Sequence, residues 1–433
     1  MARVVVVGGG WAGCAAALAA AKAGAEAVLV EKTDMLLGTG LVGGIMRNNG
    51  RFTATEEMIA MGAGELFEAT DRVATHRGID FPDHRHATLY NVTRIEPEVR
   101  AVLRKAGVDV RLRTRITAVR MEGERILAVA SRGGPPITGD VFIDTTGSAG
   151  PPGNCTRYGE GCVMCVLRCP TFGGRVGLAA LCGVRELQAV NAAGKVGAYS
   201  GSCKLAKDSL APEIVAELEE KGVVVVPIPD RLQDTTKLAL KACQQYATEA
   251  YGENLILLDT GHAKLMAPYM DLEKLRAVPG FEEARYIDPY AGGVANSVRF
   301  LAIAPHDVAL RVEGVANLYC AGEKAGPLVG HTEAICTGTL AGHNAARQAF
   351  GLEPVTIPET LAVGDAIAYV TRRLEESGGL GKKYTFSGSV YFERMRRLGL
   401  YTTDVDAVRR RVEAAGMTGF FARPVARAQA HAG

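Results

Sequence analysis

The pattern of apolar and polar residues changes twice within the first 32 positions. Four consecutive valines at 4–7 are typical of a buried strand, and the alanine-rich run at 11–23 is typical of a helix. Gly24 ends that run, and a second apolar stretch follows and closes at Glu31. This order predicts a strand, a helix and a second strand, which is a βαβ unit with parallel strands.

The same patterns predict elements further along the chain. Apolar or alternating runs indicate strands at 108–119, 140–144 and 317–320, and a run of small residues indicates a helix at 334–349.

The middle and the end of the chain read differently. Residues 211–229 predict a charged helix followed by a valine strand, and residues 237–253 are amphipathic at helical spacing. Beyond residue 371 we expect helices around 390–398 and 404–414, the second capped by Thr403 or Asp404.

Composition narrows the class of protein. With 433 residues, 48% hydrophobic and 22% charged, the chain is ordinary globular material, which excludes disordered and fibrous proteins. The net charge of +2 gives no global attraction to nucleic acid. The sequence shows neither an uncharged apolar run of about 18 residues nor a secretory signal. We therefore expect a cytoplasmic protein that does not enter a membrane.

Three glycines after the first strand carry the first chemical signal. Gly8, Gly10 and Gly13 have the G-x-G-x-x-G spacing, which supplies a tight turn, a bare backbone beside a pyrophosphate and close helix-to-strand packing. Glu31 ends the second strand, where a carboxylate accepts hydrogen bonds from ribose hydroxyls. Within a βαβ unit this pattern predicts a dinucleotide site whose phosphates face the helix amino terminus.

Three later segments favour FAD as the dinucleotide. Residues 38–51 are glycine-rich, as expected where the backbone passes close to the rest of the cofactor. An alternating strand at 108–119 precedes one at 140–144 that breaks at residues 145–147, and the strand at 317–320 leads into Gly-Glu. The sequence contains only one βαβ unit with the G-x-G-x-x-G spacing, so it has a single dinucleotide site. Any NAD(P)H would therefore approach only transiently.

The βαβ unit, the Thr-Thr-Gly strand end and the segment 317–326 together resemble the glutathione-reductase-type FAD fold, in which the chain returns to the cofactor after an insertion. The resemblance implies an α/β protein with a discontinuous Rossmann-type FAD-binding domain at 1–185 and 291–371. An inserted α+β substrate domain would occupy 186–290, and a basic helical segment would occupy 372–433.

The resemblance also implies which residues contact FAD. Ile116 would hold the adenine through its backbone, and the helix beginning near Thr332 would point at the flavin pyrimidine. The expected FAD-binding residues are Gly8, Gly10, Gly13, Glu31, Lys32, Gly40, Gly43, Gly44, Ile116, Thr145, Thr146, Gly147, Gly322, Glu323, Thr332 and Ala334.

Residues 272–371 are similar to the GidA/TrmFO flavoproteins, which modify tRNA uridines with FAD and folate-derived carbon. The similarity lies in 272-LEKLRAVPGFEEARYIDPYAG-292, 338-GTLAGHNAAR-347 and 353-EPVTIPETLAVGDAIAYVT-371. The methyltransferases carry a Cys-Ser-Asn-Ser-Leu-Arg motif in the region that here reads 43-GGIMRNNGRF-52, without a cysteine. Their glutamine in the returning strand is Glu323 here. The resemblance therefore implies the fold, with tRNA modification as an alternative function.

Four cysteines fall within fifteen positions: Cys155, Cys162, Cys165 and Cys169. The run from Cys162 through Cys169-Pro170 reproduces part of the bacterial iron–sulfur spacing, and Cys155 would complete a 4Fe-4S cluster. Cys162 and Cys165 alone form a C-x-x-C pair, typical of a catalytic redox dithiol. Zinc coordination and packing of an apolar helix are the remaining alternatives. The pattern favours a redox role and leaves its form open.

Several other side chains are candidates for chemistry. His331 and Glu333 would lie where the returning helix meets the flavin, as proton donor, substrate anchor or helix cap. His84 and His86 alternate as on one strand face and could bind an acidic substrate, although such a segment is more often a solvated turn. Three residues of the insert are further pocket candidates: His262, Lys264 and Tyr269.

Our first functional hypothesis is an FAD-dependent oxidoreductase with a redox centre at 155–169, acting on a small molecule or a redox partner protein. The alternatives are a GidA/TrmFO-like tRNA-modifying enzyme and a flavin-containing electron-transfer subunit of a larger complex. From residue 371 onward, twelve Lys/Arg stand against six Asp/Glu. That excess could bind RNA, but a solvated helix face is the simpler interpretation. We also expect a homo-oligomer.

Overall fold

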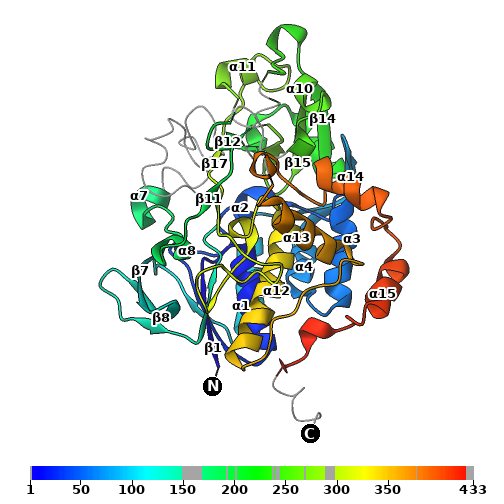
Figure 1. Ribbon diagram of the computed structural model, residues 1–433. Coiled ribbons are helices and arrows are strands. Elements are labelled where there is room, and N and C mark those ends of the chain that lie inside the picture. The colour runs from blue at the N-terminus through cyan, green and yellow to red at the C-terminus, as the bar shows by residue number, and fades with distance from the viewer. Residues whose placement is uncertain are drawn as a thin grey trace.

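The computed structural model describes residues 2–148, 168–191, 194–199, 202–236, 238, 244–267, 270–287, 298–376 and 378–425. In Figure 1 two long helices, α1 and α12, lie at the centre of the molecule, and an antiparallel layer that contains β14 and β15 lies above them. The C-terminal helices α14 and α15 run along one side. Within the described ranges, no helix combines the length and apolar character needed to cross a membrane.

A five-stranded parallel sheet in the order β19-β10-β1-β2-β6 forms the core. Its strands are β1 (Arg3–Val7), β2 (Glu26–Val30), β6 (Asp109–Arg111), β10 (Val141–Asp144) and β19 (Leu318–Cys320). Residues of β1, β2, β10 and β19 are almost all buried, as expected for a parallel sheet covered on both faces. Tyr319 and Cys320 belong to this core, as predicted, and the Rossmann-type α/β fold class is confirmed.

The helices α1 (Trp11–Lys22) and α12 (His331–Ala349) pack against each other with their backbones in contact. A Cβ atom on Gly338 would lie 2.2 Å from the carbonyl oxygen of Ala12, and one on Gly342 would lie 2.0 Å from that of Ala16. Any side chain would force the helices apart, so both positions require glycine. Since both contacts advance by four residues, the helices are parallel, and α12 extends beyond the amino-terminal end of α1 because its eighth residue meets the second residue of α1.

Other elements complete the Rossmann part. An antiparallel meander consists of β7 (Ile116–Glu122), β8 (Arg125–Ser131) and β9 (Ile137–Thr138). Helices α3 (Gly50–Ala60), α4 (Glu65–Arg72) and α5 (Ile95–Lys105) lie between β2 and β6 in the chain. The predicted single strand at 108–119 is wrong. Arg113 has a positive φ of 53°, so β6 ends and β7 begins in a different sheet.

The second layer contains two antiparallel sheets. One has the order β13-β16-β15-β14, with β13 Cys203–Leu205, β14 Val223–Pro227, β15 Asn254–Asp259 and β16 Ala263–Leu265. The other joins β3 (Ile45–Met46), β5 (His84–Tyr90) and β4 (Ala74–Phe81). Leu89 of β5 shares one apolar cluster with Ile256 and Leu258 of β15. The layer that carries the insert is therefore built partly from residues 45–90.

The C-terminal segment packs along the Rossmann part. Helices α14 (Ser389–Arg397) and α15 (Val405–Ala414) confirm the two predicted helices, and the Asp404 carboxylate caps α15 by accepting from the amides of Asp406 and Ala407. Arg394 of α14 donates twice to Asp365 of α13 (Ala362–Arg373), and α15 contacts α3.

The remaining elements are short. The helices are α2 (Gly40–Gly43), α7 (Arg168–Phe172), α8 (Leu178–Leu181), α9 (Pro212–Lys221), α10 (Ala250–Glu253) and α11 (Leu272–Arg276). Two-residue strands pair as β11 (Leu187–Gln188) with β18 (Ala302–Ile303) and β12 (Ala198–Tyr199) with β17 (Val298–Arg299). The helix-then-strand prediction for 211–229 is confirmed by α9 and β14. Of the continuous helix predicted at 237–253, the described residues show only a 3-10 turn at Gln244–Tyr246 and α10.

Candidate FAD site

The glycine turn after β1 has the geometry that its spacing predicts. A Cβ atom on Gly13 would lie 1.8 Å from the carbonyl oxygen of Gly8, and one on Gly8 (φ 109°) would lie 2.4 Å from that of Thr145. These two glycines therefore serve backbone packing. A Cβ atom on Gly10 would meet nothing within 4 Å. The bare backbone at Gly10 borders open space at the start of α1, where a pyrophosphate would lie.

Glu31 lies at the end of β2 beside this turn. One of its carboxylate oxygens accepts from the amide of Gly9 at 2.7 Å, and the other accepts from the amide of Thr33 at 2.8 Å. These bonds fix the carboxylate in the wall of a pocket of about 370 Å³. The pocket is lined by Val7, Gly8, Val30, Glu31, Lys32, Thr114, Arg115, Ile116, Thr146, Arg175 and Val176. Its ordered carboxylate suits the ribose of an adenosine.

Both helices that reach this edge begin without a side-chain cap. The N-cap residues are Gly10 for α1 and Gly330 for α12, and neither helix start has a side-chain capping bond. Because α1 and α12 are parallel and in contact, their uncapped amides and positive dipole ends point in the same direction. Gly322, with φ 64°, lies against α1, and its amide donates to Thr337 of α12 at 2.9 Å. The residues present fit a dinucleotide whose phosphates lie at α1 and whose other end reaches α12.

Three aromatic rings surround the short helix α2 next to these helix ends. Trp11, the only tryptophan of the sequence, lies 6.2 Å from the ring of Tyr90 and 6.1 Å from that of His331. The Tyr90 hydroxyl donates to the carbonyl of Gly40 at 3.0 Å and lies 3.3 Å from Nδ1 of His331. Since its proton is already used, the hydroxyl accepts from Nδ1–H. Burial raises the pKa of Tyr90, so it stays protonated.

The position of His331 also explains a glycine of α2. A Cβ atom on Gly43 would lie 1.6 Å from Cε1 of the His331 ring. Gly43 therefore gives the imidazole its place, and Tyr90 sets the orientation of the ring. With Nδ1 carrying the proton, Nε2 of His331 is the atom able to accept a proton from a substrate.

The insert also contacts α2 and the residue that follows it. Lys264 of β16 is buried and donates to the carbonyl of Val42 and to the hydroxyl of Ser202, each at 2.5 Å. A Cβ atom on Gly44 would lie 2.4 Å from Cγ2 of Thr260, so Gly44 allows the insert to approach closely. Residues predicted separately, Gly43, Gly44, His331 and Lys264, are thus brought together around α2.

Glu333 belongs to a buried ion pair. Its side chain is fully buried, and both carboxylate oxygens lie 3.1 Å from Nε of Arg51 at the start of α3. This bond ties α12 to α3. The geometry makes Glu333 a poorer candidate for proton donation than His331, because its lone pairs are occupied by donors.

A second buried cluster lies beside the Thr-Thr-Gly strand end. Lys324 is fully buried, contacts Glu186 and lies 3.9 Å from the Asp144 carboxylate at the end of β10. Asp144 also accepts from the amide and hydroxyl of Thr146 and from the amide of Ala179. The cluster fixes the edge of the sheet where Thr145 and Thr146 face Gly8 and the pocket.

Most of the cysteine cluster lies outside the described residues, since Cys155, Cys162 and Cys165 belong to 149–167. Cys169 is half-buried on α7. Among the residues that the structure describes, no three His, Cys, Asp or Glu side chains are grouped to hold a metal ion. The metal and dithiol predictions therefore stay predictions. Cys14 is buried inside α1 as expected, and burial raises the pKa of its thiol.

The two histidines at 84 and 86 do not share a face, and the interpretation of this segment as a solvated turn is wrong. His84 is buried at the start of β5, where Nδ1 accepts from the Asn48 amide at 3.0 Å and Nε2 lies 3.2 Å from the carbonyl of Gln245. Burial lowers its pKa to about 3. His86 is half-buried with φ 63°. Of the other candidates, Tyr269 lies outside the described residues.

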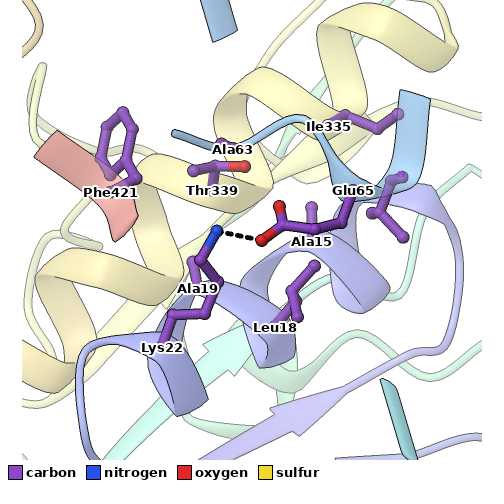
Figure 2. A pocket seen from close by; sticks show the side chains of 10 residues that line it. Ala15, Leu18, Ala19, Lys22, Ala63, Glu65, Ile335, Thr339 and Phe421 are labelled. Atoms are coloured by element: carbon purple, nitrogen blue, oxygen red, sulfur yellow. Dashed lines mark hydrogen bonds and ion pairs between the residues drawn. The ribbon is translucent and has the colours of Figure 1, made fainter. Parts of the chain in front are cut away.

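A separate small hollow lies between α1, α4 and α12 (Figure 2). Alanine and leucine side chains line it, and Lys22 reaches across to Glu65. Phe421 of the C-terminal segment lines it as well. Its walls are small and mostly apolar, and its charged residues Lys22 and Glu65 pair with each other. We therefore interpret this hollow as a packing feature between helices.

The comparisons with known proteins agree with this geometry. A family model described as FAD dependent oxidoreductase matches residues 3–150, and one described as Glucose inhibited division protein A matches residues 254–353. The first contains the βαβ unit and β10. The second contains β15, β16, β19 and all of α12, and so includes both Lys264 and His331.

Curated relatives are similar to this chain over 98 or 99 residues, about as many as the second family model matches. The methylenetetrahydrofolate–tRNA-(uracil-5-)-methyltransferase TrmFO of Symbiobacterium thermophilum is 39% identical over 98 residues, which are 22% of this chain and 21% of that protein. TrmFO of Thermus thermophilus is 36% identical over 99 residues, with 22% and 21% covered. The chain thus matches about a fifth of the length of these curated relatives.

Solved structures extend the likeness to nearly the whole chain. GidA of Aquifex aeolicus superposes in two crystal forms with TM-scores of 0.67 and 0.61, at 16% and 15% identity. These matches cover 96% and 95% of this chain and 73% and 78% of GidA. Together the findings show an FAD-flavoprotein fold, with sequence similarity to the FAD dependent oxidoreductase family over residues 3–150. The similarity to GidA and TrmFO confirms the resemblance found in the sequence.

Sequence reasoning missed three residues of the site: Trp11, Tyr90 and Arg51. Two of them have a signal, since Trp11 directly follows Gly10 and Arg51 lies two residues after the polar run Arg47-Asn48-Asn49. Tyr90 has none, because its partner His331 is far away in the sequence.

Proposed function

We propose that the chain is an FAD-dependent oxidoreductase whose substrate is a uridine base in tRNA. One observation carries the proposal. The segment that matches the Glucose inhibited division protein A family model includes β16, from which Lys264 contacts α2, and the start of α12, from which His331 contacts α2. The similarity is thus concentrated where a substrate would meet the cofactor.

FAD, when bound, supplies hydride transfer. The residues of this chain provide binding and proton handling. Gly10 leaves room for the pyrophosphate, and Glu31 presents an ordered carboxylate to the ribose. Tyr90 holds His331 with Nε2 able to exchange a proton with a base. Lys264 is buried beside α2, where it holds the carbonyl of Val42 and the hydroxyl of Ser202 and so fixes this wall of the site.

The proposal does not include transfer of a folate carbon through a cysteine, because the segment 43–52 contains none. It also keeps three earlier expectations as parts of the proposal: a cytoplasmic location, a homo-oligomer and transient approach of NAD(P)H as reductant.

The test combines binding and product analysis. Purified protein loaded with FAD is titrated with transcribed tRNA at low and moderate salt, and reoxidation of chemically reduced protein is followed with and without tRNA. We expect binding that weakens with salt and uridine-derived nucleosides of changed mass. A double-stranded DNA of equal length is the control. Absence of tRNA binding, together with unchanged nucleosides, refutes the substrate assignment while leaving flavin binding intact.

A second candidate function is electron transfer through a cysteine-based centre at 155–169. One observation favours it beyond the spacing. Lys32 donates to the carbonyl of Gly173 and Arg115 to that of Gly174, so the residues that follow Cys169 are tied to the adenosine pocket. Iron and sulfide analysis of protein purified without oxygen distinguishes an iron–sulfur cluster from a dithiol or a packing role. About four of each per chain supports a cluster, and flavin without iron leaves a dithiol at Cys162 and Cys165 or a packing role.

A further inference from the structure

Three segments far apart in the sequence meet at the amino-terminal end of α12. Arg51 comes from the start of α3, Glu333 from the first turn of α12, and Thr385 from the C-terminal segment. Arg51 donates from Nη2 to the Thr385 hydroxyl at 3.1 Å, and that hydroxyl donates to the Glu333 carboxylate at 2.6 Å. The amide of Phe386 donates to the same carboxylate oxygen at 2.9 Å. All three side chains are buried.

The packing around the carboxylate is tight. A Cβ atom on Gly330 would lie 1.9 Å from Oε2 of Glu333 and 2.2 Å from Nη2 of Arg51. Gly330 also has φ 149°, which side chains rarely adopt. The turn into α12 therefore requires glycine at position 330. The network holds the amino-terminal end of α12 in a single position.

The C-terminal residues in this network are held on two sides. The Tyr384 amide donates to the carbonyl of Pro327 at 2.7 Å, and the Val329 amide donates to the carbonyl of Tyr384 at 2.8 Å. On the other side Asn49 donates to the carbonyl of Ser387 at 2.8 Å. Residues 384–387 thus lie between the turn that leads into α12 and the start of α3.

We propose that residues 384–387 form a wall of the flavin site, and that Arg51, Glu333 and Thr385 are positioning residues that fix the cofactor-facing end of α12. This inference rests on the proposed function only in requiring that FAD binds. It adds the C-terminal segment to the site. Because coupling between sites is reciprocal, FAD binding must order residues 384–387, and loosening them must weaken FAD binding.

The first test uses the unaltered protein. Hydrogen exchange is measured by mass spectrometry for the apoprotein and after addition of saturating FAD. We expect slower exchange in peptides that cover 8–14, as direct contact with the cofactor requires, and also in peptides that cover 384–388. Protection at 8–14 with unchanged exchange at 384–388 overturns the inference. No protection in either region means that FAD does not bind, which is a failure of the proposed function.

The second test uses a matched pair of substitutions. Thr385→Val removes the hydroxyl at nearly constant volume and should weaken FAD binding about tenfold. Thr385→Ser restores the hydroxyl and should bind FAD as the unaltered protein does. Thr403→Val makes the same change at an exposed position of the same segment and should have no effect. Equal FAD affinity of the Val and Ser variants at position 385 contradicts the inference.

The third test separates electrostatic positioning from general structural support. Glu333→Gln leaves the Arg51 charge unbalanced, which favours a reduced, more negative flavin and raises its midpoint potential. Arg51→Gln leaves the carboxylate unbalanced and lowers the potential. Shifts of opposite sign are expected from charges close to the flavin. Shifts of the same sign, or none, show that the pair does not face the cofactor. If a variant fails to fold, the hydrogen-exchange experiment on the unaltered protein decides the inference.

Discussion

Replacing Gly10 by alanine separates cofactor binding from folding more cleanly than any other change near the turn. The backbone of Gly10 is extended, with φ −70° and ψ −176°, which alanine adopts without strain. The new methyl group would meet no protein atom within 4 Å. The free energy of unfolding of the apoprotein should therefore change by less than about 0.5 kcal/mol. FAD affinity should fall roughly 100-fold, about 2.8 kcal/mol, because the methyl group occupies the place of the pyrophosphate.

The neighbouring Gly13→Ala variant should instead lower the free energy of unfolding. Its methyl group would lie 1.8 Å from the carbonyl oxygen of Gly8 and 2.8 Å from Oγ1 of Thr145. Since these atoms belong to the backbone and to a buried strand end, α1 must shift, at a cost of about 1–3 kcal/mol or more. Gly381→Ala is the control. Its Cβ would also meet no atom within 4 Å, and Gly381 itself is exposed.

Both quantities are measured on the same preparations. Urea unfolding of the apoprotein, followed by far-ultraviolet circular dichroism, gives the stability change, and equilibrium dialysis against FAD gives the affinity. Retention of FAD affinity within about threefold in Gly10→Ala would refute the placement of the pyrophosphate at α1. A loss of stability in Gly10→Ala as large as in Gly13→Ala would refute the reading of open space at this position.

Three further changes test the fold around the site. Burial raises the pKa of Glu57 to about 7 from 4.5, so stability should fall by about 3 kcal/mol as the pH rises between these values, and Glu57→Gln should abolish that slope in urea unfolding at several pH values. His84 has the opposite sign. With its pKa lowered from 6.5 to about 3, it makes the protein lose stability as the pH falls through that interval, and His84→Gln should reduce the acid sensitivity of the thermal midpoint. Gly342→Ala should destabilise the protein by about 1–3 kcal/mol or more in calorimetry, because its methyl group would lie 2.0 Å from the carbonyl oxygen of Ala16; an unchanged midpoint would mean that α1 and α12 separate at no cost.

The Rossmann part could be predicted because its signals are local. The valine strand, the alanine-rich helix and the strand that ends at Glu31 each have a period that belongs to one element. The caps of the C-terminal helices are local as well, and Asp404 caps α15 as expected. The failure at 108–119 shows the limit. An alternating pattern indicates strands but does not specify the partner strand, and here Arg113 divides the run between two sheets.

The site itself depends on contacts that no local pattern encodes. Glu333 was an expected site residue, but its partner Arg51 lies 282 positions earlier and Thr385 lies 52 positions later. The sequence marks both ends as polar residues among small ones without indicating that they meet. The same holds for Tyr90, whose hydroxyl orients His331 across 241 positions.

The segment 43–52, where the resemblance would place the Cys-Ser-Asn-Ser-Leu-Arg motif, contains Met46, Asn48 and Arg51 and no cysteine. Asn48 and Arg51 have structural roles, since Asn48 donates to the buried His84 and Arg51 pairs with Glu333. Met46 is buried, and its sulfur lies 3.7 Å from the Thr332 hydroxyl in the first turn of α12. A thioether cannot form the covalent bond that a thiolate forms. The segment 43–52 therefore offers no nucleophilic thiol. If a uridine is its substrate, the reacting groups are to be sought among FAD, His331 and Lys264.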